Sequence, residues 1–341
     1  MFKCAFGAFD NTMPWPWEWH RFAKLKLMVR IHPVSLVMKI TYKRKRERGC
    51  HMSNTYKDLQ NSHPCFGGHK NNAGRIHLPV SPGCNIACRF CDRTINDVEE
   101  RPGVTSKVLK PTDCEEILTK ALEICPEIRV AGIAGPGDTL ATDNAFDTFK
   151  IIKEKFPDLI KCMSTNGLLL NERAQDVIDV GIDSLTVTVN AVDPEIESKL
   201  NAYIIYHGEK IEGVRAAEIL IKNQLEGIRK VAAAGITVKI NTVLVPEING
   251  DHIEEIARTV KEAGASIYNI IPLIPQHELK NHRAPVCAEI DDARTKASKY
   301  IDVFRHCQHC RADAVGVPGK SEFGDQIYQR KLNVKETFSH G

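Results

Sequence analysis

Short apolar runs rich in β-branched residues alternate with longer amphipathic segments from residue 75 onward. Runs of this length predict strands, and apolar positions three or four residues apart predict helices. We expect strands at 75–80, 128–133, 159–164, 184–190, 237–245 and 267–272. We expect helices near 113–124, 144–155, 172–179, 212–234, 249–263 and 289–305. Repeated strand–helix units predict a parallel sheet, and six of them predict an α/β fold with an open, partial (β/α)6 TIM-like barrel.

Two helix ends carry signals of their own. Gly235 follows the helix near 212–234, where a C-terminal cap is expected. Asp113, with Glu116 three residues later, fits a variant of the capping box at the start of the helix at 113–124. No G-x-G-x-x-G follows a strand, which argues against a dinucleotide-binding Rossmann domain. In a barrel of parallel strands, chemistry is expected at the carboxyl ends of the strands.

Composition places the chain among ordinary globular proteins. Its 341 residues are 43% hydrophobic and 26% charged, and the formal net charge of +3 is too small to argue for nucleic acid. The twelve cysteines fall largely in short clusters, which suits metal binding in a reducing compartment, so we expect a cytoplasmic protein. The sequence contains no run of 18 apolar residues, so we expect no membrane-spanning helix.

The first 51 residues differ from the rest of the chain. They hold all three tryptophans and the basic run 43–48. Such a run can contact RNA or lipid, but it is more often a solvated tail. We expect 1–51 to be an atypical, disordered extension or the product of a misassigned start. Residues 52–325 should form the main domain, with cluster-binding segments at both ends, and 326–341 a tail.

One loop carries the most specific chemistry. Cys84, Cys88 and Cys91 have C-x3-C-x2-C spacing, directly after the first expected strand. Three such thiolates can bind three irons of a [4Fe–4S] cluster and leave the fourth iron open. A structural zinc site is the alternative, but it normally takes four ligands in two close pairs. The spacing resembles that of the radical S-adenosylmethionine (SAM) superfamily, in which the open iron chelates SAM.

Polar and glycine residues stand at the ends of the following strands. Gly135 and Gly137 would let the backbone approach a ligand closely. Thr165, Asn190 and Asn241 offer hydrogen bonds at matching strand positions. Each also fits a plainer role, because glycines make ordinary turns and asparagines cap them. Their shared position favours a polar ligand, with SAM as the candidate.

Further candidate ligands lie outside the loop. Cys307 and Cys310 form a C-x2-C clamp for zinc, redox chemistry or an iron–sulfur cluster. Outside the three-cysteine loop the sequence has no second such pair, which favours a second cluster. His77 and Cys162 lie within expected strands, where each is either a core residue or a group facing the barrel.

Taken together, eight motifs resemble the NifB family of nitrogenase cofactor maturases. They are His63-Pro64-Cys65, 75–80, the three-cysteine loop, 101–106, 134–138, 164–167, 190–195 and Cys307 to Ala314. The resemblance covers about residues 60–325. It is to the short form of the family, which lacks a carrier domain.

The resemblance implies a set of site residues. The loop cysteines would hold the SAM-binding cluster. The ligands of two further [4Fe–4S] clusters would be Cys65, His77, Cys162, Cys307 and Cys310. The SAM site would be lined by Gly135, Pro136, Gly137, Thr165, Asn190 and Asn241. Glu100 and Arg101 would orient the site or pass protons.

The resemblance also implies an activity. The enzyme, of lyase or transferase type, would fuse two [4Fe–4S] clusters into an eight-iron carbide core. Methyl transfer from one SAM and hydrogen abstraction driven by a second would deliver the carbon. Its partners would be iron–sulfur cluster donors, nitrogenase cofactor carrier or scaffold proteins, and an electron donor such as ferredoxin.

The chain departs from the family pattern at one place. The family usually has another cysteine shortly before the Arg101 motif, and this chain has none there. Either Asp97 supplies an oxygen ligand instead, or one precursor cluster is held poorly or not at all. Two alternatives therefore remain open: a divergent radical SAM paralogue with fewer clusters and another substrate, and a non-catalytic iron–sulfur scaffold or carrier.

Overall fold

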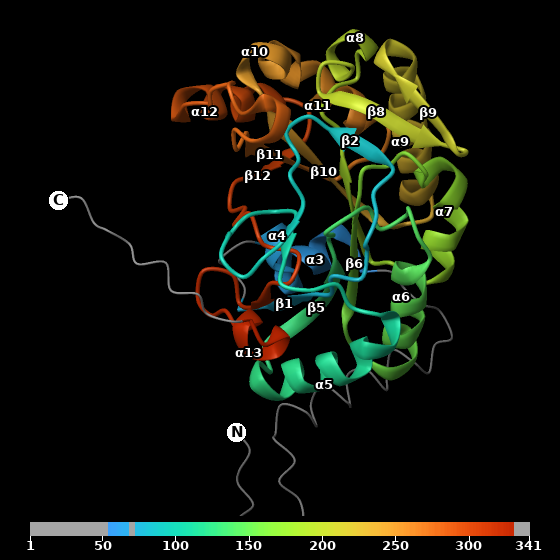
Figure 1. Cartoon of the computed structure of the whole chain (residues 1–341), viewed down its shortest axis with the longest axis vertical. Coiled ribbons are helices and arrows are strands. Elements are labelled where there is room, and N and C mark those ends of the chain that lie inside the picture. Colours follow the sequence, from blue (N-terminus) through green and yellow to red (C-terminus); the bar gives the residue numbers. More distant parts are fainter. Residues whose placement is uncertain (1–53, 68–71, 331–341) are drawn as a thin grey trace, which may run out of the picture. The chain divides into compact units, whose positions relative to one another are not determined.

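The computed structural model describes residues 54–67 and 72–330. The expected extension at 1–51 lies outside the described residues. An eight-stranded sheet has the order β12-β11-β10-β7-β6-β5-β1-β13. Its strands are β1 (Gly74–His77), β5 (Ile128–Ile133), β6 (Ile160–Thr165), β7 (Ser184–Thr188), β10 (Thr237–Leu244), β11 (Ile267–Pro272), β12 (Asp302–Phe304) and β13 (Val315–Gly316). All neighbours are parallel except β13, which pairs antiparallel with β1. The partial (β/α)6 barrel is thus confirmed (Figure 1).

Helices follow the strands in the expected order. The longer ones are α5 (Cys114–Ile124), α6 (Asn144–Lys155), α7 (Leu170–Asp179), α9 (Gly213–Ala233), α11 (Ile253–Glu262) and α12 (Cys287–Ala297). The short ones are α3 (Tyr56–Ser62), α4 (Pro64–Gly67), α8 (Pro194–Glu197), α10 (Pro246–Asn249) and α13 (Gly324–Tyr328). None in the described part of the chain is both long and apolar enough to cross a membrane.

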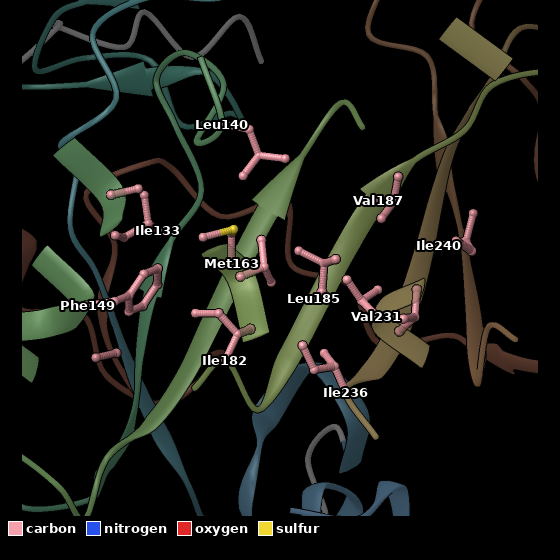
Figure 2. Close-up of a cluster of buried hydrophobic side chains, with 14 of the residues drawn as sticks. Ile133, Leu140, Phe149, Met163, Ile182, Leu185, Val187, Val231, Ile236 and Ile240 are labelled. Carbon is pink, nitrogen blue, oxygen red and sulfur yellow. The ribbon is translucent and has the colours of Figure 1, made fainter. Parts of the chain in front are cut away.

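The main core lies between the sheet and its covering helices. Met163 on β6, Leu185 on β7 and Ile240 on β10 are fully buried. They form one cluster with Phe149 of α6 and Val231 of α9 (Figure 2). Because strand side chains alternate between faces, this outward apolar set directs the intervening residues into the barrel. The inward positions are therefore where ligands can be held.

Three details of the sequence prediction are corrected. The helix expected at 289–305 ends at Ala297, because Asp302–Phe304 forms strand β12 and pairs with β11. Asp113 makes no cap contact with α5, and its carboxylate instead accepts from the Lys110 N–H (3.0 Å). The main domain runs beyond residue 325, since Ile327 and Tyr328 of α13 are buried. Gly235 has φ +87° just after α9, which confirms the expected cap.

A small sheet that the sequence pattern did not predict lies beside the three-cysteine loop. It pairs β2 (Ile86–Cys88) with β8 (Asn201–Tyr206), and β8 with β9 (Glu209–Glu212). A two-stranded parallel pair, β3 (Thr94–Ile95) and β4 (Val104–Thr105), follows the same loop. Much of the loop is therefore held by strand pairing rather than by a tight turn alone.

Candidate metal centres

The loop thiols, Cys84, Cys88 and Cys91, follow β1 along the chain. Cys88 is the last residue of β2 and pairs with Asn201 of β8, and the next N–H, of Arg89, donates to Leu200 O (2.8 Å). The Cys91 N–H donates to Cys88 O (3.0 Å). All three thiols are free and partly buried. Backbone hydrogen bonds on both sides thus fix the middle ligand of the motif.

The loop thiols are close enough to influence one another. Burial raises the pKa of all three, and at Cys88 the neighbouring Cys91 and Cys84 raise it further. A bound cation favours the thiolate form, so iron would turn these thiols into ligands. No group of three His, Cys, Asp or Glu in the described ranges is arranged around a single metal ion. A cubane cluster instead binds each thiolate at a different iron, so the donor set fits a [4Fe–4S] cluster.

The glycine turn after β5 packs against this loop. A Cβ on Gly137 would lie 1.9 Å from Gly83 O. The Gly137 N–H donates to Ser81 O and the Asp138 N–H to Gly83 O, both at 2.8 Å. Gly137 therefore makes a close approach to the backbone of the chain itself, at Gly83, where the sequence predicted a close approach to a ligand. Gly135 has φ +126°, a conformation that favours glycine, and the position that its Cβ would take is 3.5 Å from Ala312 Cβ.

Asp138 links two strand ends to the loop, a role that the sequence reading missed. Its buried carboxylate accepts from the Thr165 hydroxyl (2.8 Å), the Asn166 N–H (2.6 Å) and the Leu140 N–H (2.9 Å). The Asn166 amide donates to Asn85 Oδ1 (2.7 Å) and lies 3.7 Å from the Cys84 sulfur. The position of Asp138 directly after a glycine turn could have predicted this role, because a carboxylate there can accept hydrogen bonds from free backbone N–H groups.

The two predicted strand asparagines serve the framework as well. Asn190 Oδ1 accepts from the Val243 N–H (3.0 Å), which ties the end of β7 to β10. Asn241 Oδ1 accepts from the Asn269 amide (3.0 Å) in the next strand. The hydroxyl of Thr165 is likewise bound to Asp138. Contacts of Gly135, Pro136, Gly137, Thr165, Asn190 and Asn241 with SAM stay predictions.

A second group of thiols gathers inside the barrel. Cys65 of α4, Cys162 of β6 and Cys307 after β12, here called the barrel thiols, pack against one apolar cluster. That cluster is Leu59, Phe66, Val130, Ile160, Ile267 and Phe304. Surrounding protein raises the pKa of Cys65 to about 12, and the nearby Lys239 acts in the opposite direction. The structure thus brings together three predicted ligands that are far apart in the sequence.

His77 is prepared as a neutral ligand. Its Nδ1 lies 3.0 Å from Arg311 O, and burial, with help from Arg75, lowers its pKa to about 4. A neutral ring that donates from Nδ1 leaves the Nε2 lone pair for a metal. His77 is in register with Gly132, and Gly132 with Cys162. A Cβ on Gly132 would lie 3.1 Å from His77 Cδ2, so the bare glycine leaves space between the two candidate ligands.

Cys310 belongs to a network of buried arginines. Its sulfur lies 3.5 Å from Arg75 Nη2, and Arg75 also pairs with Glu322 (3.1 Å). Arg311, next in the chain, is fully buried; it pairs with Asp313 (2.8 Å) and donates to Asn96 O (2.8 Å). The C-terminal segment thereby holds the stretch that contains Asp97, another role that the motif did not reveal.

The two predicted catalytic residues lie in different settings. The Glu100 side chain is 69% exposed and lies 3.6 Å from Arg330 Nη1. Arg101 is buried; it donates to Asp92 O and pairs with Glu99 (3.0 Å). Arg101 therefore orders the segment after Cys91, while a proton-passing role for either residue stays a prediction.

Known proteins resemble both the sequence and the fold. Residues 78–260 match the Radical SAM superfamily. The FeMo cofactor biosynthesis protein NifB of Methanocaldococcus infernus is 48% identical over 283 residues, covering 82% of this chain and 93% of that relative. The chain belongs to the NifB family of radical SAM enzymes. NifB of Klebsiella pneumoniae is 40% identical, covering 77% of this chain and 58% of that protein.

The fold comparison agrees with the family. Streptococcus suis SuiB bound to S-adenosylmethionine has a TM-score of 0.52 at 13% identity, covering 78% of this chain and 60% of SuiB. At that identity the likeness shows the radical SAM fold alone. Family membership implies a [4Fe–4S] cluster and SAM as cofactors. The residues present fit these cofactors, because the three loop thiols lie close enough to one another to bind one cluster.

Proposed function

We propose that this enzyme fuses two [4Fe–4S] clusters, its substrates, into the eight-iron carbide core of the nitrogenase cofactor. The observation that carries the proposal is the presence of two separate sets of candidate iron ligands on one barrel. The loop thiols lie near the carboxyl ends of the strands, and the barrel thiols lie inside with His77. One set suits a resident cofactor, and the other suits a substrate.

The chain's own residues have distinct tasks in this reaction. With its cluster bound, SAM supplies the methyl group and the radical chemistry that inserts the carbon. Asp138 and Asn166 fix the position of Cys84, and the pairing of β2 with β8 fixes Cys88. The amides of Asn190, just after β7, and Asn241, within β10, would orient SAM.

The barrel ligands suit clusters that must later fuse and leave. Cys65, Cys162, Cys307, Cys310 and His77 provide few thiolates and one imidazole for two clusters. His77 is held as a neutral donor by Arg311 O. Weak anchorage from such a set would let the product depart toward a carrier protein. The enzyme would depend on iron–sulfur donors and on a reductant such as ferredoxin.

Anaerobic reconstitution tests the proposal. Wild-type protein should bind about twelve irons, as three cubanes require. SAM should yield both S-adenosylhomocysteine and 5′-deoxyadenosine, and the chain should restore nitrogen fixation to a strain that lacks its maturase. Full iron loading without either SAM product would refute the proposal and leave an iron–sulfur scaffold or carrier.

A second candidate, a paralogue with fewer clusters, is favoured by one residue. Asp97 stands where the family usually has a cysteine, and its charge acts on the buried Arg311. A carboxylate engaged by arginine is a poor iron ligand. Asp97→Cys should then raise the iron content from about eight toward about twelve. Wild-type protein that already binds twelve would remove this candidate.

A further inference from the structure

Two buried lysines in this barrel differ in what balances their charge. Lys161 of β6 is 2% exposed, and its Nζ lies 3.3 Å from Asp183 Oδ2. Lys239 of β10 is 4% exposed, and its Nζ donates to Cys65 O at 3.2 Å. The same ammonium lies 4.3 Å from the centroid of the Phe304 ring. Within the described residues, no carboxylate lies within ion-pair distance of Lys239.

An ammonium with these partners lacks a counter-charge. A carbonyl and an aromatic face stabilise a cation only in part, and burying an unpaired charge is costly. Lys161 shows that the same sheet can supply a carboxylate where one is needed. The missing negative charge at Lys239 therefore indicates an anion that binds beside it.

The surroundings of Lys239 identify that anion. Cys65, whose carbonyl it contacts, and Phe304 belong with Cys162 and Cys307 to one packed group. The charge of Lys239 acts on the thiols of Cys65 and Cys162. A [4Fe–4S] core with several thiolate ligands carries a net negative charge. The barrel thiols would place such an anion next to the ammonium.

We propose that Lys239 is a positioning residue that anchors the anionic iron–sulfur substrate in the barrel. The inference rests on the proposed function, because it needs a cluster at the barrel thiols. An ion pair holds a substrate without forming a bond to its iron, so the substrate can still depart. The ion pair would also compensate for the small number of thiolates.

A purely structural role is the competing explanation, because the bond to Cys65 O could simply hold α4. Three substitutions separate the two roles. Lys239→Met removes charge and donor, Lys239→Gln keeps a donor without charge, and Lys239→Arg keeps both. Lys161→Met is the matched control, since it leaves the buried Asp183 without its cation.

The first measurement is the stability of the metal-free proteins in urea. If Lys239 anchors substrate, Lys239→Met should be as stable as wild type or more stable, because an unpaired buried charge is gone. Lys161→Met should be clearly less stable. Comparable losses of stability in both variants would assign Lys239 to the framework and overturn the inference.

The second measurement is iron content with electron paramagnetic resonance after reconstitution. Lys239→Met and Lys239→Gln should lose at least half of the iron beyond the first four, and Lys239→Arg should keep most of it. The SAM-responsive signal of the loop cluster should persist in all three. Any barrel cluster that remains in Lys239→Met should have a lower reduction potential, because a nearby cation stabilises the reduced state.

Two other outcomes are decisive. If the wild type binds more than about four irons and Lys239→Met binds as many, the inference is overturned and the proposed function is unaffected. Wild-type protein that binds only about four irons overturns both, because no barrel substrate then exists.

Discussion

The loop thiols and the barrel thiols offer similar donors but are built in opposite ways. The loop set comes from eight consecutive residues, fixed by pairing with β8. The barrel set is assembled from α4, β6 and the segment after β12. Buried carboxyl groups, Asp138 and Glu197, act on the loop thiols, together with the buried Arg101 at Cys91. The buried cation Lys239 acts on the barrel thiols, together with Asp183 at Cys162. Arg93 also acts on the loop thiols, from an exposed position.

The difference matches what each site would bind under the proposed function. SAM is a sulfonium cation, and Glu197, whose pKa burial raises to about 8, would be able to ionise when such a cation binds. The proposed iron–sulfur substrates are anions, and a fixed ammonium would attract them from the outset. A local, hydrogen-bonded loop suits a resident cofactor, while a dispersed set of ligands suits cargo that comes and goes.

The loop site should fail completely when its centre is removed. Cys88→Ala deletes the ligand that β8 fixes, so SAM cleavage should fall to background. Iron content should drop by about four, because only one cubane is lost. Quantifying 5′-deoxyadenosine and iron in the same sample checks both. Retention of SAM cleavage would mean that Cys88 is not a ligand of the catalytic cluster.

The barrel site should respond in a different way. Cys162→Ala should lower the iron content by about four while the loop cluster keeps its SAM-responsive signal. Carbide-core formation should stop, because one substrate is no longer held. Cys287→Ala, an exposed cysteine outside both sites, is the control and should leave iron unchanged. If the SAM-responsive signal of the loop cluster were lost as well, the two sets of thiols would not be independent sites.

The sequence predicts the loop site better than the barrel site for a physical reason. Cys84, Cys88 and Cys91 are neighbours along the chain, so their spacing alone indicates a cluster. The inward direction of Cys162 follows from strand alternation, but its proximity to Cys65 and Cys307 depends on how α4 and the segment after β12 pack against the sheet. Apolar runs located the main strands closely for the same local reason.

What the sequence could not reveal depends on neighbours in space. Lys239 reads as one polar residue in a strand, and only the packing shows that it lacks a carboxylate. Asp138 lies in a motif, yet its bonds to Thr165 and Asn166 follow from the adjacency of β5 and β6. The strand β8 has a mixed pattern, because its main task is to pair with the loop.

The packing of the glycine turn can be tested without touching a ligand. Gly137→Ala places a Cβ 1.9 Å from Gly83 O, and backbone on both sides leaves little room to yield. We expect about 1–3 kcal/mol of destabilisation, as overpacking of this kind produces, with weakened binding of the loop iron. Gly250→Ala, where a Cβ meets nothing within 4 Å, is the matched control. Equal urea midpoints for the two variants would contradict the close approach.

The smallest expected effect concerns Glu197, the carboxyl near Cys88. Burial raises its pKa from 4.5 to about 8, partly offset by the Asn201 amide. The folded state therefore keeps a proton that the unfolded chain releases. This contribution to stability is complete below pH 4.5 and is lost as the pH rises toward 8.

Glu197→Gln should flatten that dependence by keeping a neutral side chain at every pH. In metal-free protein, urea midpoints should show a gain of stability at pH 8 and little change at pH 5. Glu195→Gln, on the same short helix but exposed, should change neither. If Glu197→Gln instead lowers stability equally at both pH values, the carboxyl is charged in the empty site. The contrast between a protonated carboxyl behind the loop thiols and a fixed cation behind the barrel thiols would then be wrong.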